Sequence, residues 1–254
     1  MKLGAQMYTV RAFTTTLDGL RQSLERIARI GYPGVQISAI GPIDVHDVAR
    51  ACRELGLEVA STHEKWSRFL TELDRVIEEY RILGARHTAI GSLPVEYHTP
   101  AGIDRFLEEL GPVARRLAAE GMDFSYHNHS HELARFDGQT LLARLYEGAG
   151  GDVLKAEIDT YWIQAGGADP AQWIRRLGSR QPLLHIKDMA VTPDRQQRFA
   201  PVGEGNLNWP PIVEAARQMG VEWSLVEQDD CYGADPFECL ATSFRNARAM
   251  GLGS

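Results

Sequence analysis

Several apolar runs of this chain end in residues that can hold a divalent metal ion or move a proton. Histidine, aspartate and glutamate side chains bind such ions and also act as general acids and bases. When they follow successive strands of a closed parallel sheet, they meet at one end of it. The layout therefore predicts a metal site that can transfer protons. The five runs end at His63, His127–His129, Glu157–Asp159, His185–Asp188 and Glu227.

Three of these residues end an apolar strand, where an unpaired charge or imidazole would be unfavourable. Asp159, His185 and Glu227 each follow several apolar residues. Because burying such a group without a partner costs several kcal/mol, we expect the three to ligate a metal ion or to join a hydrogen-bond network. Alternate residues of a strand share a face, so His127 and His129 should point the same way. His127 is the preferred ligand since it lies nearer the strand; His129 is a close second, and a solvated loop is the alternative.

Other groups beside these residues could move protons or stabilise charge. Glu157 and Asp159 share a face, and Asp159, nearer the rim, is assigned to the metal. Glu157, one layer deeper, could support a ligand or act as a catalytic acid. Lys187 could neutralise a developing enolate oxygen or orient a substrate hydroxyl. A structural ion pair with Asp188 is the alternative role for this lysine.

Residues that flank the strand ends are candidates for contact with a substrate. His63 and Glu64 follow the third strand and could touch a substrate, or they could begin a loop that caps the next helix. Trp66 and Trp162 could provide the apolar platform on which sugar C–H faces stack, or they could belong to the core. The loop 201–206 contains two glycines and is predicted to be a mobile cover over the site.

Eight strand-like runs alternate with eight helix-like stretches along the chain. In the stretch 17–30, apolar residues recur at helical spacing and Gly31 follows, as expected at a helix end. Short, continuously apolar strands that alternate with helices are typical of a parallel sheet buried on both faces. At 254 residues, the natural closure is a single (β/α)8 TIM barrel domain over residues 1–254. The expected strands are 3–9, 34–38, 57–62, 87–91, 122–127, 153–159, 182–187 and 222–227, and the expected helices are 17–30, 45–55, 69–83, 101–120, 139–147, 170–177, 210–219 and 236–250.

Composition and charge disfavour several other classes of protein. A doubly wound open sheet is the structural rival, but no G-x-G-x-x-G follows the first strand, so nucleotide binding has no support. The net charge of −7 gives no attraction to nucleic acid or to an anionic membrane. No apolar stretch approaches the roughly 20 residues that span a bilayer. Three scattered cysteines and an N-terminus without a signal-peptide core predict a cytoplasmic protein with reduced thiols.

The order of these motifs resembles the xylose-isomerase-like barrel superfamily, in its sugar phosphate isomerase/epimerase branch. That branch includes inosose dehydratases, hydroxypyruvate isomerases, ketose 3-epimerases and enzymes that process 3-keto-glycosides. The resemblance covers the whole chain, and its loop motif adds Glu204 to the candidate substrate contacts. The matching stretches are Tyr126–His129, Glu157–Trp162, Leu184–Met189, Val202–Gly205 and Val226–Asp229.

The resemblance implies one divalent ion, most often Mn2+, with Mg2+, Co2+, Zn2+ or Fe2+ as alternatives. Relatives hold it with Glu, Asp, His and Glu on the fifth to eighth strands. Asp159, His185 and Glu227 match the last three positions. The first position falls on His127, which departs from the pattern and counts against simple two-base epimerisation.

The resemblance also implies a reaction class. A keto-sugar or cyclic polyol would lose a proton alpha to a carbonyl through a metal-stabilised enediolate, as in an isomerase, an epimerase or a dehydratase-type lyase. His127 favours elimination slightly among these outcomes. Glu227 is then the surest base. Its possible partners in proton transfer are Glu132, Glu157, His129 and Lys187.

Two other functional classes remain as alternatives. A non-catalytic sugar-binding or regulatory barrel could have kept the fold and lost the chemistry, although retained Asp159, His185 and Glu227 argue against this. An abasic-site endonuclease-like hydrolase is less favoured, because those relatives place a histidine where this chain has Trp162. We expect a small sugar or polyol as the partner, with no nucleic acid and no membrane. Barrels of this kind often pair, so a homodimer is one possible assembly.

Overall fold

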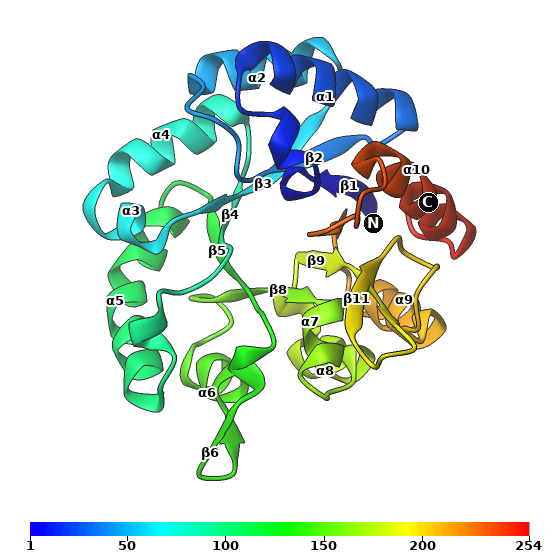
Figure 1. The fold of residues 1–254 in the computed structure, drawn as a ribbon. Coiled ribbons are helices and arrows are strands. Elements are labelled where there is room, and N and C mark those ends of the chain that lie inside the picture. The colour runs from blue at the N-terminus through cyan, green and yellow to red at the C-terminus, as the bar shows by residue number, and fades with distance from the viewer. Residues whose placement is uncertain (254) are drawn as a thin grey trace.

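Eight parallel strands close into one barrel in the computed structural model, which describes residues 1–253 (Figure 1). Around the barrel the strands follow the order β1-β12-β9-β8-β5-β4-β3-β2. The predicted (β/α)8 TIM barrel is therefore confirmed; the last residue of the predicted domain, Ser254, lies outside the described residues. The strands are β1 (Lys2–Gln6), β2 (Gly34–Ile37), β3 (Glu58–Glu64), β4 (His87–Ile90), β5 (Asp123–His127), β8 (Lys155–Asp159), β9 (Leu183–Ile186) and β12 (Trp223–Val226).

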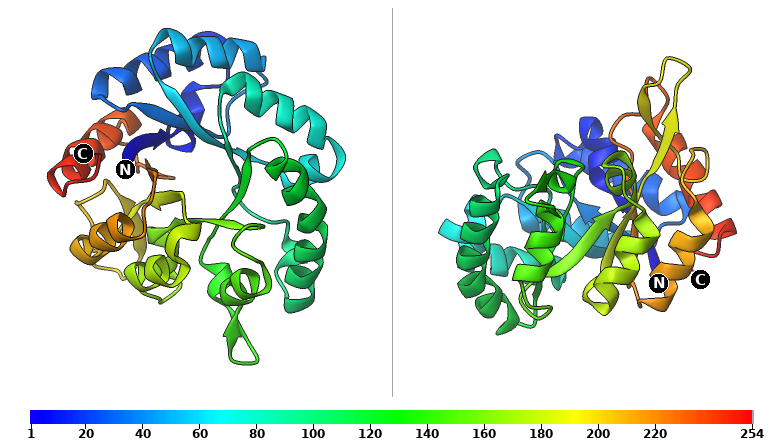
Figure 2. Two further views of the ribbon diagram at one scale, coloured as in Figure 1. Left: turned by 180° about the vertical axis from the view of Figure 1, so that it is seen from behind. Right: turned by 90° about the horizontal axis from the view of Figure 1, so that it is seen from below.

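Helices surround the barrel on its outer side (Figures 1 and 2). In α1, the Thr16 side chain accepts a hydrogen bond from the Gly19 N–H at the start, and Gly31 ends the helix in the left-handed conformation. The helices are α1 (Leu17–Ile30), α2 (Val45–Glu54), α3 (Trp66–Thr71), α4 (Leu73–Leu83), α5 (Pro100–Ala118), α6 (Leu141–Gly148), α7 (Thr160–Ala165), α8 (Pro170–Leu177), α9 (Trp209–Gln218) and α10 (Pro236–Ala249).

Three stretches at the carboxyl end of the barrel differ from the sequence prediction. The expected strand 3–9 stops at Gln6, whose side chain accepts from Tyr8 N and starts the short 3-10 helix η1 (Met7–Phe13). The expected helix 69–83 is two helices, because the backbone at Glu72 (φ −135°, ψ 30°) is not helical. The short helix α7 was not predicted, since six residues are too few for a recognisable apolar period.

Two hairpins interrupt the strand–helix alternation. The strands β6 (Arg135–Phe136) and β7 (Gln139–Thr140) precede α6, so the helix expected at 139–147 begins later, at Leu141. The strands β10 (Asp188–Val191) and β11 (Gln197–Ala200) pair between β9 and α9. This second hairpin rises above the end of the barrel opposite to the N-terminus (Figure 2). It therefore stands beside the carboxyl ends of the strands, where the predicted site residues lie.

Within residues 1–253, no helix is long and apolar enough to cross a membrane.

Candidate metal centre and active site

Four side chains from four neighbouring strands converge at the carboxyl end of the barrel. His127 ends β5, Asp159 ends β8, His185 belongs to β9, and Glu227 follows β12 directly. One ligand atom from each lies within 4.8 Å of those of the other three, and all four residues are buried. The structure thus brings together the four residues predicted as metal ligands. Whether these four residues bind an ion stays a prediction. Their hydrogen-bond partners show whether the donor atoms are suited to one.

Hydrogen bonds orient both imidazoles so that one nitrogen of each faces a carboxylate. His127 Nδ1 lies 3.0 Å from the Gly91 carbonyl oxygen, so this nitrogen carries the proton and donates it. His127 Nε2 then turns a lone pair toward Asp159 Oδ2, 3.2 Å away. Two acceptors at this distance repel unless a cation or a proton lies between them. The His127–Asp159 pair therefore fits a bound metal ion.

His185 has the same arrangement with the nitrogens exchanged. Its Nε2–H donates to Gln36 Oε1 at 2.7 Å, and its Nδ1 lies 3.0 Å from Glu227 Oε2. Burial alone would lower the pKa of His185, but the carboxylates of Glu157 and Glu227 outweigh burial and raise the pKa to about 10. Without an ion, a proton therefore occupies the Nδ1 position. A divalent ion would displace that proton, as metals do when they bind imidazole.

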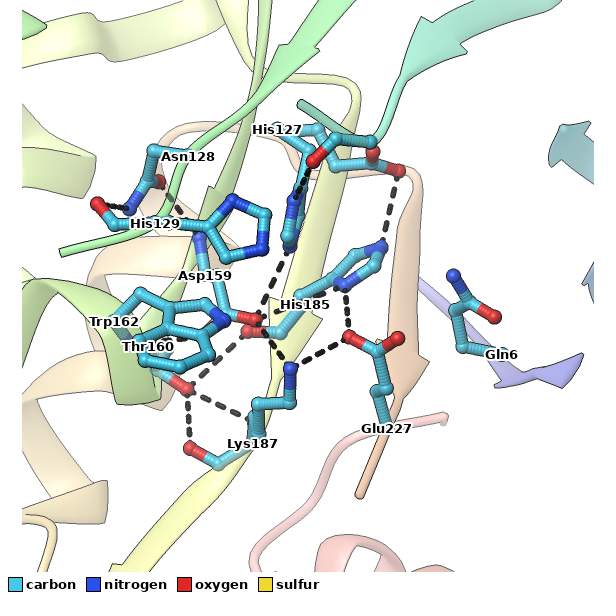
Figure 3. Close-up of polar contacts among 12 residues, drawn as sticks. Gln6, His127, Asn128, His129, Asp159, Thr160, Trp162, His185, Lys187 and Glu227 are labelled. Carbon is cyan, nitrogen blue, oxygen red and sulfur yellow. Dashed lines mark hydrogen bonds and ion pairs between the residues drawn. The ribbon is translucent and has the colours of Figure 1, made fainter. Parts of the chain in front are cut away.

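The lysine at the centre of the site neutralises part of the carboxylate charge. Lys187 Nζ lies 2.8 Å from Glu227 Oε2, 3.3 Å from Asp159 Oδ2 and 2.7 Å from Asp229 Oδ1. Figure 3 shows its ammonium group between Asp159 and Glu227. Burial alone would lower the pKa of Lys187, but these carboxylates, Asp159 foremost, raise it above its usual range. The amine is therefore a permanent cation and a hydrogen-bond donor.

A second layer of polar side chains lies beneath the four converging residues. Glu157 Oε1 accepts from Gln36 Nε2 at 2.6 Å, and Glu157 Oε2 lies 2.6 Å from His63 Nε2. Burial would raise the pKa of Glu157, but His185 and His63 lower it below its usual range, so the group is ionised. With no exposed surface and both oxygens bonded, Glu157 fits the predicted supporting role. It does not fit the alternative role of a catalytic acid, which must reach a substrate.

A ligand atom of His63, one of Glu157 and one of His185 also lie within 4.8 Å of one another. This second grouping shares His185 with the first. Since Gln36 Nε2 and His63 Nε2 already occupy the two Glu157 oxygens, we assign the ion to the group that includes Asp159.

The loop predicted as a mobile cover is held in place by Asp188. Its buried carboxylate accepts five hydrogen bonds, from the backbone N–H groups of Met189, Gly203, Gly205 and Leu207 and from Trp209 Nε1. A Cβ at Gly205 would lie 2.4 Å from Asp188 Oδ1, so only glycine fits there. These hydrogen bonds hold the loop in one position. The Asp188 carboxylate bonds the loop instead of pairing with Lys187.

Several residues predicted to act in the site lie elsewhere, and the structure corrects them. Trp66 is 2% exposed and packs edge-on against Phe106 and Phe124 in the core, so it cannot stack on a substrate. Glu204 is exposed and accepts from Asn246 Nδ2 at 2.9 Å on α10, which turns it away from the barrel mouth. Both side chains are held by partners on the surrounding helices, Glu109 of α5 and Asn246 of α10, which the sequence motif did not reveal.

Two acidic residues have local structural partners instead of reaching the predicted centre. Glu64 forms an ion pair with Arg68 at the start of α3, which fits the alternative prediction of a polar loop start. Glu132 Oε1 accepts from Tyr126 Oη at 2.7 Å, and Oε2 accepts from His129 N at 2.8 Å. The Glu132 carboxylate is therefore bonded within the loop after β5, outside the four-residue centre, and its role as a partner in proton transfer stays a prediction.

Three predicted substrate contacts do border the site. The His63 side chain is 10% exposed and its ring stacks on His185, with centroids 5.3 Å apart. The rings of His129 and Trp162 lie 5.1 Å apart on the other side, near Lys187. Within residues 1–253, His129 Nδ1 and Trp162 Nε1 are buried without a hydrogen-bond partner, so each could bind a ligand. Burial, with His127 adding to it, lowers the pKa of His129 to about 3, so its ring is neutral.

The sequence interpretation did not assign the roles that three residues have in the site. Asp229 pairs with Lys187 and is 22% exposed, and burial together with Glu227 raises its pKa to about 6. Its position two residues after Glu227 was a signal, since alternate residues share a face. Asn128 Oδ1 accepts from the backbone N–H of Asp159 at 3.0 Å. The role of Gln36 had no signal, because its partners lie more than a hundred residues away.

The sequence comparison places this chain in a family. Residues 24–242 match the family model described as xylose isomerase-like TIM barrel. This match covers most of the chain, so the protein belongs to the xylose isomerase-like TIM barrel family. No curated protein matches the chain.

Solved structures of sugar-converting enzymes share the fold. A sugar phosphate isomerase/epimerase from Parabacteroides distasonis ATCC 8503 superposes with a TM-score of 0.80 at 23% identity, covering 100% of this chain and 96% of that chain. An L-ribulose 3-epimerase gives a TM-score of 0.76 at 19% identity, with 98% and 94% covered. A D-allulose 3-epimerase from Methylomonas sp. in complex with D-allulose gives 0.72 at 15% identity, with 98% and 97% covered. At these identities the likeness shows the fold.

We predict that the Asp188→Ala substitution strongly destabilises the protein. It leaves five N–H donors without their acceptor, and a bond to a charged group contributes about 1.5–3 kcal/mol. We expect the free energy of unfolding to fall by more than about 3 kcal/mol, as measured by chemical denaturation. Asp194→Ala in the same hairpin is the control, because Asp194 is exposed and should change stability by less than about 0.5 kcal/mol. Equal stability of the two variants would contradict the role of Asp188.

We also predict that Gln36→Leu weakens metal binding without removing a ligand. The substitution deletes the acceptor for His185 Nε2–H and the donor to Glu157, and loss of such outer contacts typically reduces metal affinity about 10–100-fold. The affinity can be measured by competition with a chelator. Gln218→Leu on the surface of α9 should leave it unchanged. Wild-type affinity in the Gln36 variant would show that His185 needs no such support.

Proposed function

We propose that this protein is a divalent-metal-dependent enzyme of the sugar isomerase, epimerase or lyase type. It would act on a keto-sugar or cyclic polyol by removing a proton alpha to a carbonyl. The observation that carries the proposal is the convergence of His127, Asp159, His185 and Glu227 around one point, with the Lys187 ammonium beside it. The metal-ion identity, most often Mn2+ in the superfamily that the sequence resembles, is part of the proposal.

The chemistry of the proposed site divides among its residues. The four converging side chains would hold a divalent ion, which would supply Lewis acidity to a substrate carbonyl. Glu227 removes the proton from the carbon beside that carbonyl. Lys187 donates a hydrogen bond to the enolate oxygen that develops, an electrostatic stabilisation that is strong in a buried site. Asp229 shares Lys187 and is partly exposed, so it is placed to return a proton.

The residue on the fifth strand bears on which product forms. His127 is fixed by the Gly91 carbonyl on one nitrogen and turned toward Asp159 on the other. It therefore cannot act as the second carboxylate base, on the face of the substrate opposite to Glu227. This supports elimination of a β-substituent, or isomerisation, over epimerisation by two opposed carboxylates.

Recognition of a sugar would involve the rings on either side of the metal centre. His129 and Trp162 offer aromatic faces on one side, and His63 borders the other. Among residues 1–253, Trp162 Nε1 has no hydrogen-bond partner, so it could donate to a sugar hydroxyl while C–H groups pack on the rings. A cytoplasmic location and a homodimeric assembly are further parts of this proposal, and they rest on the sequence alone.

The test is solvent deuterium exchange measured by NMR. The manganese-loaded protein in D2O, with a panel of ketoses, inososes and 3-keto-glycosides, should exchange the proton alpha to the carbonyl of one class. Glu227→Gln and Lys187→Met should each lower the rate by at least about 100-fold, since each removes a group that acts in the transition state. Asp159→Ala should abolish both exchange and the retention of the ion at the four-residue centre.

Glu204→Gln is the matched control, because Glu204 is exposed and bonded to Asn246. It should exchange at the wild-type rate. An absence of exchange with every substrate, in protein shown to hold its ion, would overturn the catalytic proposal in favour of a sugar-binding barrel.

A further inference from the structure

A second group of metal-binding side chains lies in the loop after β5. A ligand atom of His129, one of His131 and one of Glu132 lie within 4.8 Å of one another. None of the three belongs to the four-residue centre. We propose that these three residues form a second metal site that takes a divalent transition ion of the zinc type.

The buried carboxylate of this group lacks a permanent cation as a partner. The Glu132 side chain is 2% exposed, and among residues 1–253 its ion-pair partner is His131, with Nε2 3.1 Å from Oε1. This partner is an imidazole, so the structure gives Glu132 no lysine or arginine partner among residues 1–253. Burying an ionised carboxylate without a cation is strongly unfavourable. A bound metal ion would supply the missing positive charge.

The two imidazoles have few other partners. Among residues 1–253, His129 Nδ1 is buried without a hydrogen-bond partner, and His131 Nε2 approaches Glu132 Oε1, a member of the same group. The two imidazole rings are nearly parallel, with an interplanar angle of 16° and centroids 5.7 Å apart. The His131 side chain is 37% exposed, which gives an ion a route from solvent.

The carboxylate is also held in the manner of a metal ligand. Tyr126 Oη donates to Oε1 at 2.7 Å, and the His129 backbone N–H donates to Oε2 at 2.8 Å. A carboxylate has about four lone-pair positions, so two remain after these bonds. Hydrogen bonds of this kind orient ligating carboxylates in metal sites and increase their affinity.

The donor set favours zinc-type ions over calcium or magnesium. Two imidazole nitrogens and one carboxylate oxygen form a three-residue set that zinc completes with a fourth position for water or a substrate oxygen. Calcium and magnesium prefer oxygen ligands throughout. The rings of His127 and His129 lie 4.9 Å apart, so the second ion would border the first centre on its substrate-facing side.

The experiment counts ions in metal-stripped, full-length protein that is reloaded with Zn2+ or Co2+ and dialysed. Elemental analysis should find two ions in the wild type, one in His131→Ala and one in Asp159→Ala or Asp159→Asn. The double variant should hold none. The visible absorption band of four-coordinate Co2+ should persist in the Asp159 variants and be lost in the corresponding spectrum of the double variant.

His46→Ala is the control for adventitious binding by a surface histidine, because His46 is exposed on α2, and it should keep both ions. A wild type that holds one ion, lost with Asp159, would overturn the second site. Two ions retained by a folded His131→Ala would overturn it as well. The inference does not depend on the proposed activity, because no turnover is measured and the Asp159 variants report separately on the first centre.

Discussion

The structure depends on the burial of three ionised carboxylates at one end of the barrel. Glu157 and Asp159 have no exposed surface, and Glu227 is 5% exposed. Burial by itself raises the pKa of each, yet each is held below its usual range by cations and imidazoles around it. Such a concentration of charge persists only where every partner is fixed. Lys187 supplies a permanent positive charge, and His185 supplies a second one unless a divalent ion replaces its proton.

This constraint explains why particular side chains are needed at positions outside the four converging residues. Gln36 is buried between Glu157 and His185, donating to one and accepting from the other, a pair of roles that an amide performs and a carboxylate at the same position could not. Asp188 anchors the loop after β11 through five N–H groups, and so fixes the chain that carries Lys187. The mechanism therefore relies on positions set by hydrogen bonds before any ligand arrives, which is how preorganised sites stabilise charge.

Sequence reasoning was strong where a local pattern determines structure. The strand–helix repeat predicted the barrel, and the apolar runs predicted that His127, Asp159, His185 and Glu227 would meet. It failed where tertiary contacts determine which way a side chain points. The partners that turn Glu204 and Trp66 outward lie on α10 and α5, and the five donors of Asp188 could not be foreseen from glycine spacing alone. Gln36 illustrates the general limit, because its function arises from neighbours on strands distant in sequence.

We propose that His127 takes the position of a carboxylate ligand, so that a bound ion would have two imidazole ligands. Pulsed electron paramagnetic resonance of the Mn2+-loaded protein tests this proposal most directly, since bound imidazole nitrogens couple to the electron spin. At the four-residue centre we predict couplings from two nitrogens in the wild type and from one in His127→Glu, with an ion still bound there in each. Spectra without nitrogen coupling, or identical spectra for the two proteins, would contradict this account of the metal centre.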